Sequence, residues 1–547
     1  MAVSAEAIED EFSSFGINLN ENELNNCIGL CVRYTLSEEE LADNWVAFSS
    51  SLPSNDQSLK ESSLKKFDEY LEKQKKTTVI PINSQITNET EVPKTPANVG
   101  TKRQIDLVSP ELPLKNSTPS LDVIGKYKNR TNSLNALVQY GDPRTNWIGE
   151  RWEPNIQIWR KMGEYKYMYQ SLRDVSYVFD DLIDYMGSII VEENDLGEVA
   201  NVSQQHPDPV ICVGRICCEA ADARLNSKSV LLQGSVSSSK GGTTSLDVSE
   251  VANYALFPGQ VVAVRGSNPT GKIINVSEIY YPKVESPMSL KPSADKGILQ
   301  MVVACGPFHI GDSLNFSPLE DFLKYVVNSK PQLCLLLGPI ISARKLNANN
   351  WPSNLTFKEE LDRVVNLIDL KLGESETKVY IVASSMECSE TPVYPTPPFR
   401  VPSKNISVVS DPVKMRIEDL KVNLTSSDIF RHLTDQEIKY GGTYASREER
   451  ILQYLLEQKS MYPLYPPSLH MNIDYVQWEN YARIEETPHI IVLPSDYKGF
   501  IKAVNGILFV NPERLVKNDS GGTFARIAVD MNAEDVSSQI TAEIVYI

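Results

Sequence analysis

Four apolar runs in the C-terminal half of the chain end in short loops, at the places where an α/β enzyme usually carries catalytic or metal-binding side chains. The runs cover residues 298–304, 333–337, 379–383 and 490–493. The loops that follow them are Cys305-Gly306-Pro307, Gly338-Pro339, Ser384-Ser385-Met386-Glu387 and Pro494-Ser495-Asp496. These loops contain no histidine and only two carboxylates. The order of the apolar runs and loops suits an enzyme, whereas the side chains in the loops indicate a binding protein.

The chemistry that such loops could support is metal-dependent hydrolysis of phosphate esters. An active metallophosphoesterase places Asp-x-His, Gly-Asp, Gly-Asn-His-Asp/Glu and Gly-His-x-His after successive strands, and its two metals activate a bridging water. The positions here that match those ligands are Cys305, Pro307, Pro339, Ser385, Met386, Glu387 and Asp496. Only Glu387 and Asp496 retain an oxygen ligand, and Pro339 stands where the metal-bridging aspartate would be. We therefore predict no metal, no cofactor and no catalytic residue.

One alternative keeps some enzymatic chemistry. A rearranged phosphoesterase could use Glu387, Asp496 and one of the five histidines of the chain. His309 and Asp312 could act as ligands or as a base, but no second histidine cluster supports that role. We interpret them as loop residues with local hydrogen bonds.

A second motif has the glycine and lysine spacing of a phosphate-binding loop, from Gly266 to Lys272. That motif requires Ser or Thr after the lysine and a helix whose N-terminal amides face the phosphates. Here Ile273 follows the lysine and begins another apolar run. We predict a β-hairpin turn at this place.

Composition limits the classes of function. The 547 residues suffice for about three domains, and the formal charge of −18 argues against a protein whose main task is to grip a phosphate backbone. The eight cysteines are sparse, and Cys27 and Cys31 lack a second pair of ligands for zinc. There is no signal sequence and no run of about 18 apolar residues. We expect a soluble intracellular protein that does not enter a membrane.

The sequence divides into four parts. Residues 1–76 form a predicted helical domain, with a capping box at Ser37–Glu40. Residues 77–146 lack hydrophobic periodicity and are expected to be a disordered tether, since they are rich in Pro, Ser and Thr. Residues 147–290 are expected to hold a helical lead-in followed by a barrel. Residues 291–547 alternate strands with amphipathic helices, which predicts a layered α/β domain.

Two features suggest regulation and recruitment. Residues 1–75 contain 15 acidic and six basic residues, which suits a solvated surface or a module that docks basic partner segments. The tether contains Thr95-Pro96, Ser109-Pro110 and Thr118-Pro119, three dipeptides that are possible phosphorylation sites.

The middle of the chain has a β pattern between residues 205 and 283. Its short runs and Gly/Ser-rich turns suit a Greek-key barrel of the oligonucleotide-binding (OB) type. The strands carry few exposed aromatic or basic residues, so contact with protein is at least as well supported as binding of single-stranded DNA. Before the barrel, residues 147–186 are rich in aromatics, and we expect a helical stretch whose aromatics pack in a core.

Several segments together resemble a known family. They are Phe257-Pro258-Gly259-Gln260-Val261-Val262-Ala263-Val264-Arg265-Gly266, Gly306-Pro307-Phe308, Leu337-Gly338-Pro339, Tyr394-Pro395-Thr396-Pro397-Pro398-Phe399, Asn511-Pro512-Glu513-Arg514 and Gly521-Gly522-Thr523-Phe524-Ala525-Arg526. In this order, after a helical N-terminal domain and a Ser/Thr-Pro tether, they resemble the B subunits of DNA polymerase alpha–primase complexes. The small subunits of other replicative polymerases share the barrel and the inactive phosphoesterase, but lack this combination of long tether and closing segment.

The resemblance carries functional expectations. It implies a multidomain α+β protein with an OB-type barrel and a calcineurin-like phosphoesterase fold that lacks metal ligands. It implies a non-catalytic accessory subunit in the nucleus, acting at the initiation of DNA replication. Its barrel and phosphoesterase-like domain would bind the C-terminal domain of the polymerase catalytic subunit, with primase in the same complex. Residues 1–76 would recruit other replication factors, and contact with DNA would be indirect or weak.

Overall fold

The computed structural model describes residues 5–49, 61–77 and 125–547 apart from short gaps. The gaps are residues 15–16, 18, 35, 126, 143, 145, 164, 220–223, 291–295, 312–313, 343–353, 443–445, 518–519 and 533–539. The chain forms two compact units, residues 1–120 and 121–547. No helix among the described residues is long and apolar enough to cross a membrane. Thr95, Ser109, Thr118 and Asp312 lie outside the described residues.

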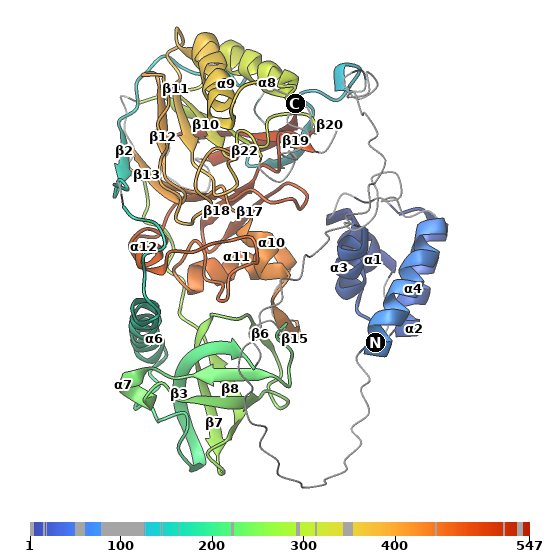
Figure 1. Ribbon diagram of the computed structural model, residues 1–547, viewed down its shortest axis with the longest axis vertical. Helices are drawn as coiled ribbons and strands as arrows, with labels where there is room; N and C mark the ends of the chain where they lie inside the picture. Colours follow the sequence, from blue (N-terminus) through green and yellow to red (C-terminus); the bar gives the residue numbers. More distant parts are fainter. Residues whose placement is uncertain are drawn as a thin grey trace, which may run out of the picture. The chain divides into compact units, whose positions relative to one another are not determined.

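The described residues of the first unit form four helices, in agreement with the helical pattern of the sequence (Figure 1). They are α1 (Ala5–Ser14), α2 (Glu21–Tyr34), α3 (Glu38–Ser49) and α4 (Glu61–Thr77). Each buries one apolar face, and the shared core includes Phe12, Trp45 and Phe67. Trp45 and Phe67 meet edge to face with their ring centroids 5.1 Å apart. Cys27 and Cys31 are buried on α2 in this core, where the thiols act as small apolar side chains.

The second unit, which we call the body, contains two sheets that pack face to face. The seven-stranded sheet has the order β1-β22-β21-β9-β10-β11-β12. Its strands are β1 (Ala136–Tyr140), β9 (Ile298–Cys305), β10 (Leu333–Leu337), β11 (Lys378–Val382), β12 (Ile406–Val409), β21 (Thr523–Asp530) and β22 (Ile540–Tyr546). The neighbours β9 to β12 run parallel, so their carboxyl ends meet at one edge.

The six-stranded sheet has the order β17-β18-β16-β14-β13-β2. Its strands are β2 (Ile156–Trp159), β13 (Val413–Ile417), β14 (Leu420–Leu424), β16 (Ile490–Val492), β17 (Phe500–Val504) and β18 (Ile507–Asn511). A continuous apolar core fills the space between the two sheets. Helices α8 (Ser317–Ser329) and α9 (Phe357–Leu372) cover the outer face of the seven-stranded sheet, as Figure 1 shows. This is the layered α/β sandwich that the alternation of strands and helices predicts.

A closed five-stranded barrel confirms the β pattern in the middle of the chain. Its strands, in sequence, are β3 (His206–Cys218), β4 (Val230–Gln233), β5 (Thr243–Asp247), β7 (Val261–Asn268) and β8 (Ile273–Tyr280), with the short helix α7 (Val236–Ser239) after β4. The motif from Gly266 to Lys272 forms the end of β7 and the turn that leads into antiparallel β8. The structure therefore confirms a hairpin there, with no helix that could face a phosphate.

The start of the body corrects the expected extent of the tether. The composition of residues 77–146 predicts a segment without structure, but Ala136–Tyr140 is strand β1, which pairs antiparallel with β22. Tyr127 is buried in the core below α8 and α9, and Arg130 donates a hydrogen bond to the carbonyl of Ile547 at 2.7 Å. The sequence around a five-residue edge strand gives little indication of a strand, because the stability of the strand comes from a partner about 400 residues away.

The aromatic stretch also differs from the expectation. The predicted helical segment 147–186 begins with strand β2, and helix α6 (Leu172–Asn194) starts only at residue 172. Ile156 and Ile158 alternate with Gln157 and Trp159, a period of two that indicates a strand. Most of these aromatics are not in a core, since Trp159 is 45% exposed and Tyr169 is 78% exposed. The lead-in thus serves both domains, because β2 joins the six-stranded sheet and α6 packs on the barrel.

The barrel is attached to the rest of the body by specific contacts. Strand β6 (Tyr254–Leu256) pairs with β15 (Ile438–Tyr440), which follows the short helix α10 (Ile429–Thr434). The Gln458 side chain, at the end of α11 (Arg447–Glu457), accepts a hydrogen bond from the Val261 amide and donates one to its carbonyl, at 2.8 and 3.1 Å. The guanidinium of Arg215 lies between the rings of Phe179 and Tyr465. These contacts join the barrel to α6, to β15, to the end of α11 and to the loop that contains Tyr465.

Candidate functional site

The loops after β9 and β10 touch each other at the edge where a metal site would be built. A Cβ atom placed on Gly306 would lie 1.7 Å from the Pro339 carbonyl oxygen. The Gly306 amide also donates to the Leu337 carbonyl at 2.9 Å. Because the two backbones are in direct contact, the glycine is required at this close approach.

A cationic side chain lies at these strand ends. Arg514, which follows β18, donates from Nη1 to the Cys305 sulfur at 3.1 Å and from Nε to Asp496 Oδ1 at 2.9 Å. Its Nη2 lies 3.8 Å from Asp428 Oδ2, and its side chain is 14% exposed. Arg431 approaches the other Asp496 oxygen at 3.3 Å. A guanidinium thus lies at the carboxyl end of β9, bound to Cys305 and to Asp496.

Two carboxylates balance the Arg514 charge. Asp428 caps helix α10 (Ile429–Thr434) by accepting from the Arg431 amide, and its second oxygen accepts from the Asp496 amide at 2.8 Å. Burial, together with the charge of Asp496, raises the pKa of Asp428 to about 6. Burial alone would lower the pKa of Arg514, but Cys305, Asp496 and Asp428 outweigh it and raise that pKa. The cation is therefore permanent.

Cys305 behaves as a thiol that accepts a hydrogen bond. Burial raises its pKa to about 11, and Arg514 offsets only part of that effect. The side chain is fully buried. A thiol that stays protonated at neutral pH is a poor metal ligand and a poor nucleophile.

Glu387 is used by the backbone and does not face the strand-end opening. Its carboxylate accepts hydrogen bonds from the Ile340 and Ile341 amides, at 2.6 and 2.9 Å. The residue is 3% exposed, and burial raises its pKa to about 7 although the backbone hydrogen bonds oppose that shift. These contacts fix the loop that follows Pro339. A carboxylate that resembles a metal ligand in the sequence is a structural group here.

The remaining matched positions line a crevice between the rim and the barrel. Pro307, Pro339, Ser385, Met386 and Asp496 border it, and its volume is about 1090 Å³. The barrel side contributes Cys217, Cys218, Glu219, Arg224 and Pro258. Asp496 thus faces the crevice, whereas Glu387 does not border it. The two surviving carboxylates are not brought together.

The residues at this edge do not fit a dinuclear metal centre. Among the described residues, no three His, Cys, Asp or Glu side chains form a group that could hold a metal ion. The place between Cys305, Asp428 and Asp496 is taken by the Arg514 guanidinium. A second cation next to this arginine would be repelled strongly, since the surroundings are largely desolvated. The Arg514 contacts instead tie the strand ends into one ion-pair network.

His309 is a buried loop residue, as the sequence suggested. Its Nδ1 hydrogen-bonds to the Gly311 carbonyl oxygen at 3.0 Å, and its Nε2 accepts from the Ser342 amide at 3.4 Å. Both ring nitrogens therefore face the backbone. This histidine ties the loop after β9 to the loop after β10.

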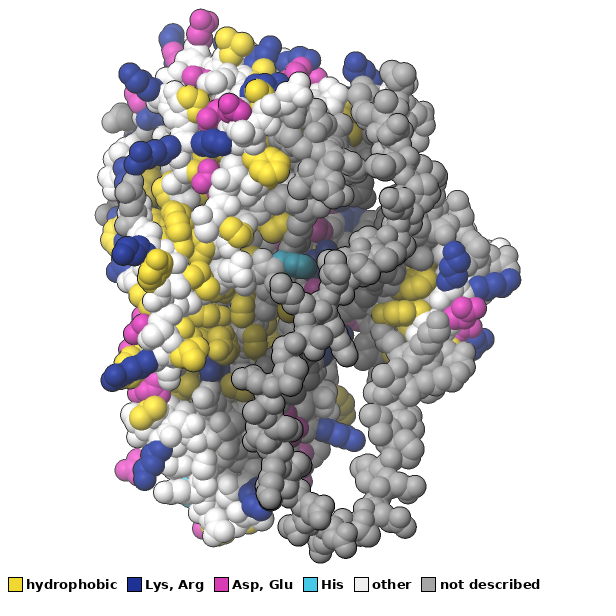
Figure 2. Space-filling model, viewed as in Figure 1, with side chains coloured by type: hydrophobic (Ala, Val, Ile, Leu, Met, Phe, Trp, Pro, Cys, Tyr) yellow, Lys and Arg dark blue, Asp and Glu magenta, His cyan; other side chains and the backbone are white. Residues whose placement is uncertain are grey.

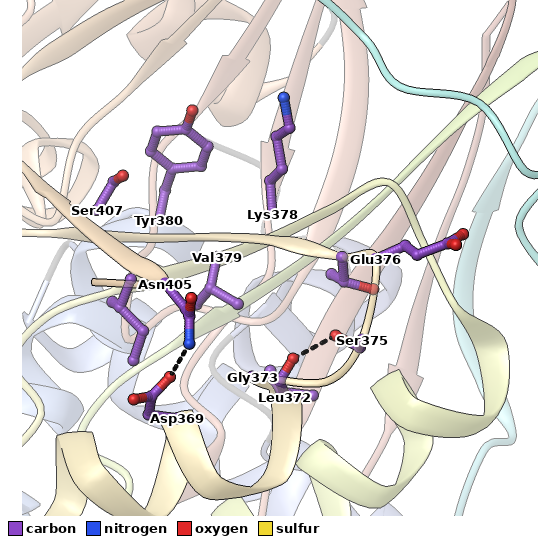
Figure 3. Close-up of a pocket in the computed structure, with 12 residues that line it drawn as sticks. Asp369, Leu372, Gly373, Ser375, Glu376, Lys378, Val379, Tyr380, Asn405 and Ser407 are labelled. Atoms are coloured by element: carbon purple, nitrogen blue, oxygen red, sulfur yellow. Dashed lines mark hydrogen bonds between the residues drawn. The ribbon is translucent and has the colours of Figure 1, made fainter. Parts of the chain in front are cut away.

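A smaller pocket lies at the opposite end of the parallel strands (Figure 3). It has a volume of about 210 Å³ and lies between the end of α9 and the beginnings of β11 and β12. Asp369 accepts from the Asn405 amide at 2.9 Å, and Ser375 donates to the Leu372 carbonyl at 2.6 Å. Ligands of open α/β sheets bind outside the carboxyl ends of the strands, so this pocket is not the equivalent of an active site.

Apolar side chains collect on the surface between the sheets and the barrel. Figure 2 shows hydrophobic side chains over the middle of the body, at the level at which Figure 1 places α11 and α12 (Tyr475–Tyr481). Exposed apolar residues of the body include Met168, Tyr169, Leu172 and Leu469, and Leu469, which borders the crevice, is 97% exposed. Exposed apolar groups in such number typically mark a surface that contacts protein.

The sequence did not identify Arg514 and Asp428 as members of the site. Arg514 belongs to one of the family-like segments, but its role depends on a fold contact with Cys305, 209 positions away. Asp428 is an ordinary N-cap residue in the sequence. No local sequence signal reveals this pairing, because Asp428 needs a counter-charge only once the fold buries it next to Asp496.

Comparisons with known proteins give a consistent result. A family model for the B subunit of DNA polymerases alpha and epsilon matches residues 301–502. Models for the OB domain and for the N-terminal part of the DNA polymerase alpha B subunit match residues 176–282 and 6–73. The DNA polymerase alpha B subunit of Rattus norvegicus is 30% identical, over 98% of this chain and 98% of its own. That of Schizosaccharomyces pombe is 29% identical, over 68% of each.

One solved structure that resembles part of the chain is vacuolar protein sorting 29 from Cryptosporidium parvum. It covers 46% of this chain and 99% of its own, with 14% sequence identity and a TM-score of 0.24.

Proposed function

This chain belongs to the family of DNA polymerase alpha B subunits, and we propose that its body is a non-catalytic scaffold within a DNA polymerase alpha complex. Its place of action would be the nucleus, at the initiation of DNA replication. The observation that carries this proposal is the Arg514 guanidinium at the strand ends, held by Cys305, Asp428 and Asp496. This arrangement uses the rim of a phosphoesterase as an internal ion-pair network and leaves its outer shape available for binding.

The crevice between barrel and rim is the surface that we assign to the polymerase catalytic subunit. It is bordered by both domains and by exposed apolar residues such as Leu469. A C-terminal domain of the catalytic chain that entered it would contact the barrel and the phosphoesterase-like part together. Primase would join through the same complex, and contact of this chain with DNA would be indirect or weak.

The first unit would have a separate task. Residues 1–76 would recruit other replication factors through their acidic surface, and phosphorylation at Thr95, Ser109 or Thr118 would regulate that recruitment. The long segment between the units would let the helical domain sample partners without rigid docking.

Absence of hydrolysis is the direct test of the non-catalytic role. Purified protein in manganese should release no more product from a chromogenic phosphodiester than the Glu387→Ala variant does, because Glu387 and Asp496 cannot share a metal. Calorimetry should likewise show no tight manganese binding. Robust turnover that disappears in Glu387→Ala would contradict the proposal and favour the residual phosphoesterase.

Truncation tests where the main interface lies. A variant that lacks residues 1–120 keeps the whole body. It should co-purify with the polymerase catalytic chain as well as the full chain does. Loss of association on this deletion would instead place the interface in the helical unit.

A longer truncation provides the control. Deleting residues 1–145 removes β1, Tyr127 and Arg130, which pair with β22 and with the end of the chain. This variant should have a lower yield and a lower melting temperature than the variant that starts at residue 121. The comparison separates loss of an interface from loss of the fold.

A further inference from the structure

The outer face of the six-stranded sheet carries a polar pair that the scaffold role does not explain. Lys414 on β13 is directly opposite Asn423 on β14 and also opposite Trp159 on β2. The three side chains therefore form one row across neighbouring strands, on the face away from the second sheet. Directly opposite residues have Cβ atoms about 5 Å apart. This row borders a small pocket of about 30 Å³.

Two donors of this row have no acceptor. Lys414 Nζ and Asn423 Nδ2 are shielded from solvent and make no hydrogen bond with any residue that the structure describes. Asn423 is 4% exposed. A buried donor without a partner costs about 1–3 kcal/mol, and a charged one costs more, so such groups are rarely kept without a reason. The Lys414 ammonium and the Asn423 amide nitrogen are both donors, so each of them needs a hydrogen-bond acceptor.

The two nearby carboxylates already pair with other cations. Glu485 pairs with Arg160 at 2.8 Å and accepts from the Trp159 indole at 3.3 Å. Glu486 pairs with Arg416 and with Lys421, each at 2.9 Å. Together with Arg483, which influences Lys414, the cluster has five cations and two carboxylates. It is locally positive on a chain whose formal charge is −18.

Lys414 remains charged at neutral pH. Burial lowers its pKa to about 8, with Arg160 and Arg483 acting in the same direction and Glu485 and Glu486 against it. An anion next to this ammonium would therefore stabilise it, because little water reaches it. An anionic group that reaches this pocket would gain a charge-assisted hydrogen bond from Lys414 and an amide hydrogen bond from Asn423.

We propose that this pocket is a socket for a single carboxylate, the side chain of an aspartate or glutamate on a partner protein. A monoanion fits better than a phosphate, because Glu485 and Glu486 flank the pocket and would repel a more highly charged group. A nucleic-acid backbone needs a groove of repeated cations, whereas this is one pocket. Trp159 borders the pocket and is 45% exposed, which gives the pocket an aromatic edge of the kind that protein interfaces use.

The proposal rests on the scaffold role only for the identity of the partner, which would be a protein of the polymerase complex. Binding of a small carboxylate by the isolated chain tests the pocket by itself. If that binding fails while co-purification with the catalytic chain persists, the socket is refuted and the scaffold role is not.

The first experiment uses acetate as the probe. At equal ionic strength and pH 7, about 100 mM acetate should raise the melting temperature of the full chain by about 1–2 °C over chloride. Neutral acetamide should not do so, and inorganic phosphate should do so less than acetate. Lys414→Met should abolish the acetate shift, whereas Lys502→Met, which removes a charge from exposed β17 of the same sheet, should keep it. Equal shifts in all variants, or none in the wild type, would show that the pocket holds water only.

The second experiment finds the occupant in the assembled complex. A water-soluble carbodiimide joins an amine to a carboxylate that it touches, with loss of one water, and mass spectrometry locates the bond. We expect Lys414 to couple to an aspartate or glutamate of another subunit, and Lys414→Met to weaken the complex at least fivefold. Coupling of Lys414 only to Glu485 or Glu486, in both the free chain and the complex, would overturn the proposal.

Discussion

Replacing Arg514 with methionine should lower the free energy of unfolding of the body by about 3–5 kcal/mol, the usual cost of removing one partner from a buried ion pair. The substitution leaves the Asp428 and Asp496 carboxylates next to each other without their shared cation, and it leaves the Cys305 sulfur without its donor. Asp428 is the more affected carboxylate, because its side chain is 10% exposed. Chemical denaturation monitored by circular dichroism measures the change.

Three variants separate the causes. Arg514→Lys keeps the charge but loses the planar fork, so it should recover only part of the stability. Adding Asp428→Asn to Arg514→Met should recover a further part, because the uncompensated charge is gone. Arg416→Met, which breaks a surface pair with Glu486 at 36% and 44% exposure, should cost less than about 1 kcal/mol. If Arg514→Met were as mild as Arg416→Met, the network would not hold the rim.

The same variant has a predictable pH dependence. Asp428 has a pKa of about 6 in the fold, above its ordinary value of 3.8, so the folded state binds this proton more tightly than the unfolded state. Stability from this group is therefore lost as the pH rises through about 4 to 6. The Arg514 cation lowers the pKa of Asp428. In Arg514→Met, the pH range over which stability is lost therefore extends to higher pH.

The measurement compares the two proteins across that window. The stability deficit of Arg514→Met should be largest at pH 8 and should shrink as the pH falls toward 5, where Asp428 becomes protonated. The Arg416→Met deficit should change little over the same range. A deficit of Arg514→Met that stays constant from pH 8 to 5 would assign the loss to packing and not to charge.

The sequence predicted the parts of this site that depend on local pattern. The apolar runs 298–304, 333–337, 379–383 and 490–493 became β9, β10, β11 and β16, because short continuous apolar runs are typical of buried parallel strands. The hairpin between β7 and β8 followed from the residue after Lys272.

What the sequence could not predict depends on contacts between distant segments. The Glu387 carboxylate binds the amides of Ile340 and Ile341, and nothing near residue 387 indicates that use. The strand β1 exists because β22 offers it an edge, and β2 because β13 does. Short edge strands obtain their stability from a partner and not from their own composition.

Replacing Arg215 with alanine should have the second large effect, a loosening of the barrel from the rest of the body. The Arg215 guanidinium lies 4.1 Å from the ring centroid of Phe179 and 4.6 Å from that of Tyr465. It starts on β3, whereas the rings belong to α6 and to the loop before α12. One side chain therefore joins three elements at the boundary between the two domains.

The expected loss is about 2–4 kcal/mol, since each desolvated cation–π contact contributes up to about 2 kcal/mol. Arg215 is 6% exposed, and its Nε and Nη1 have no hydrogen-bond acceptor among the described residues. Only Nη2 donates, to Gln233 at 2.6 Å. The rings, and not hydrogen bonds, therefore account for most of its interaction. Hydrogen exchange should show faster exchange around residues 258–261 and 458–465.

The barrel and the strand-end loops form the two walls of the crevice, and a partner can bind there only if the walls stay at a fixed distance. Loosening the barrel should therefore also weaken binding of the partner. Arg215→Ala should weaken association with the polymerase catalytic chain, although Arg215 does not border the crevice and meets it through Tyr465 and the Cys217 thiol. Arg215→Lys should restore little, because an ammonium cannot stack on two rings at once. Arg265→Ala, which removes a 46% exposed barrel arginine beside Tyr280, should change neither exchange nor association. If Arg215→Ala bound normally despite faster exchange, the partner itself would supply the rigidity of the crevice.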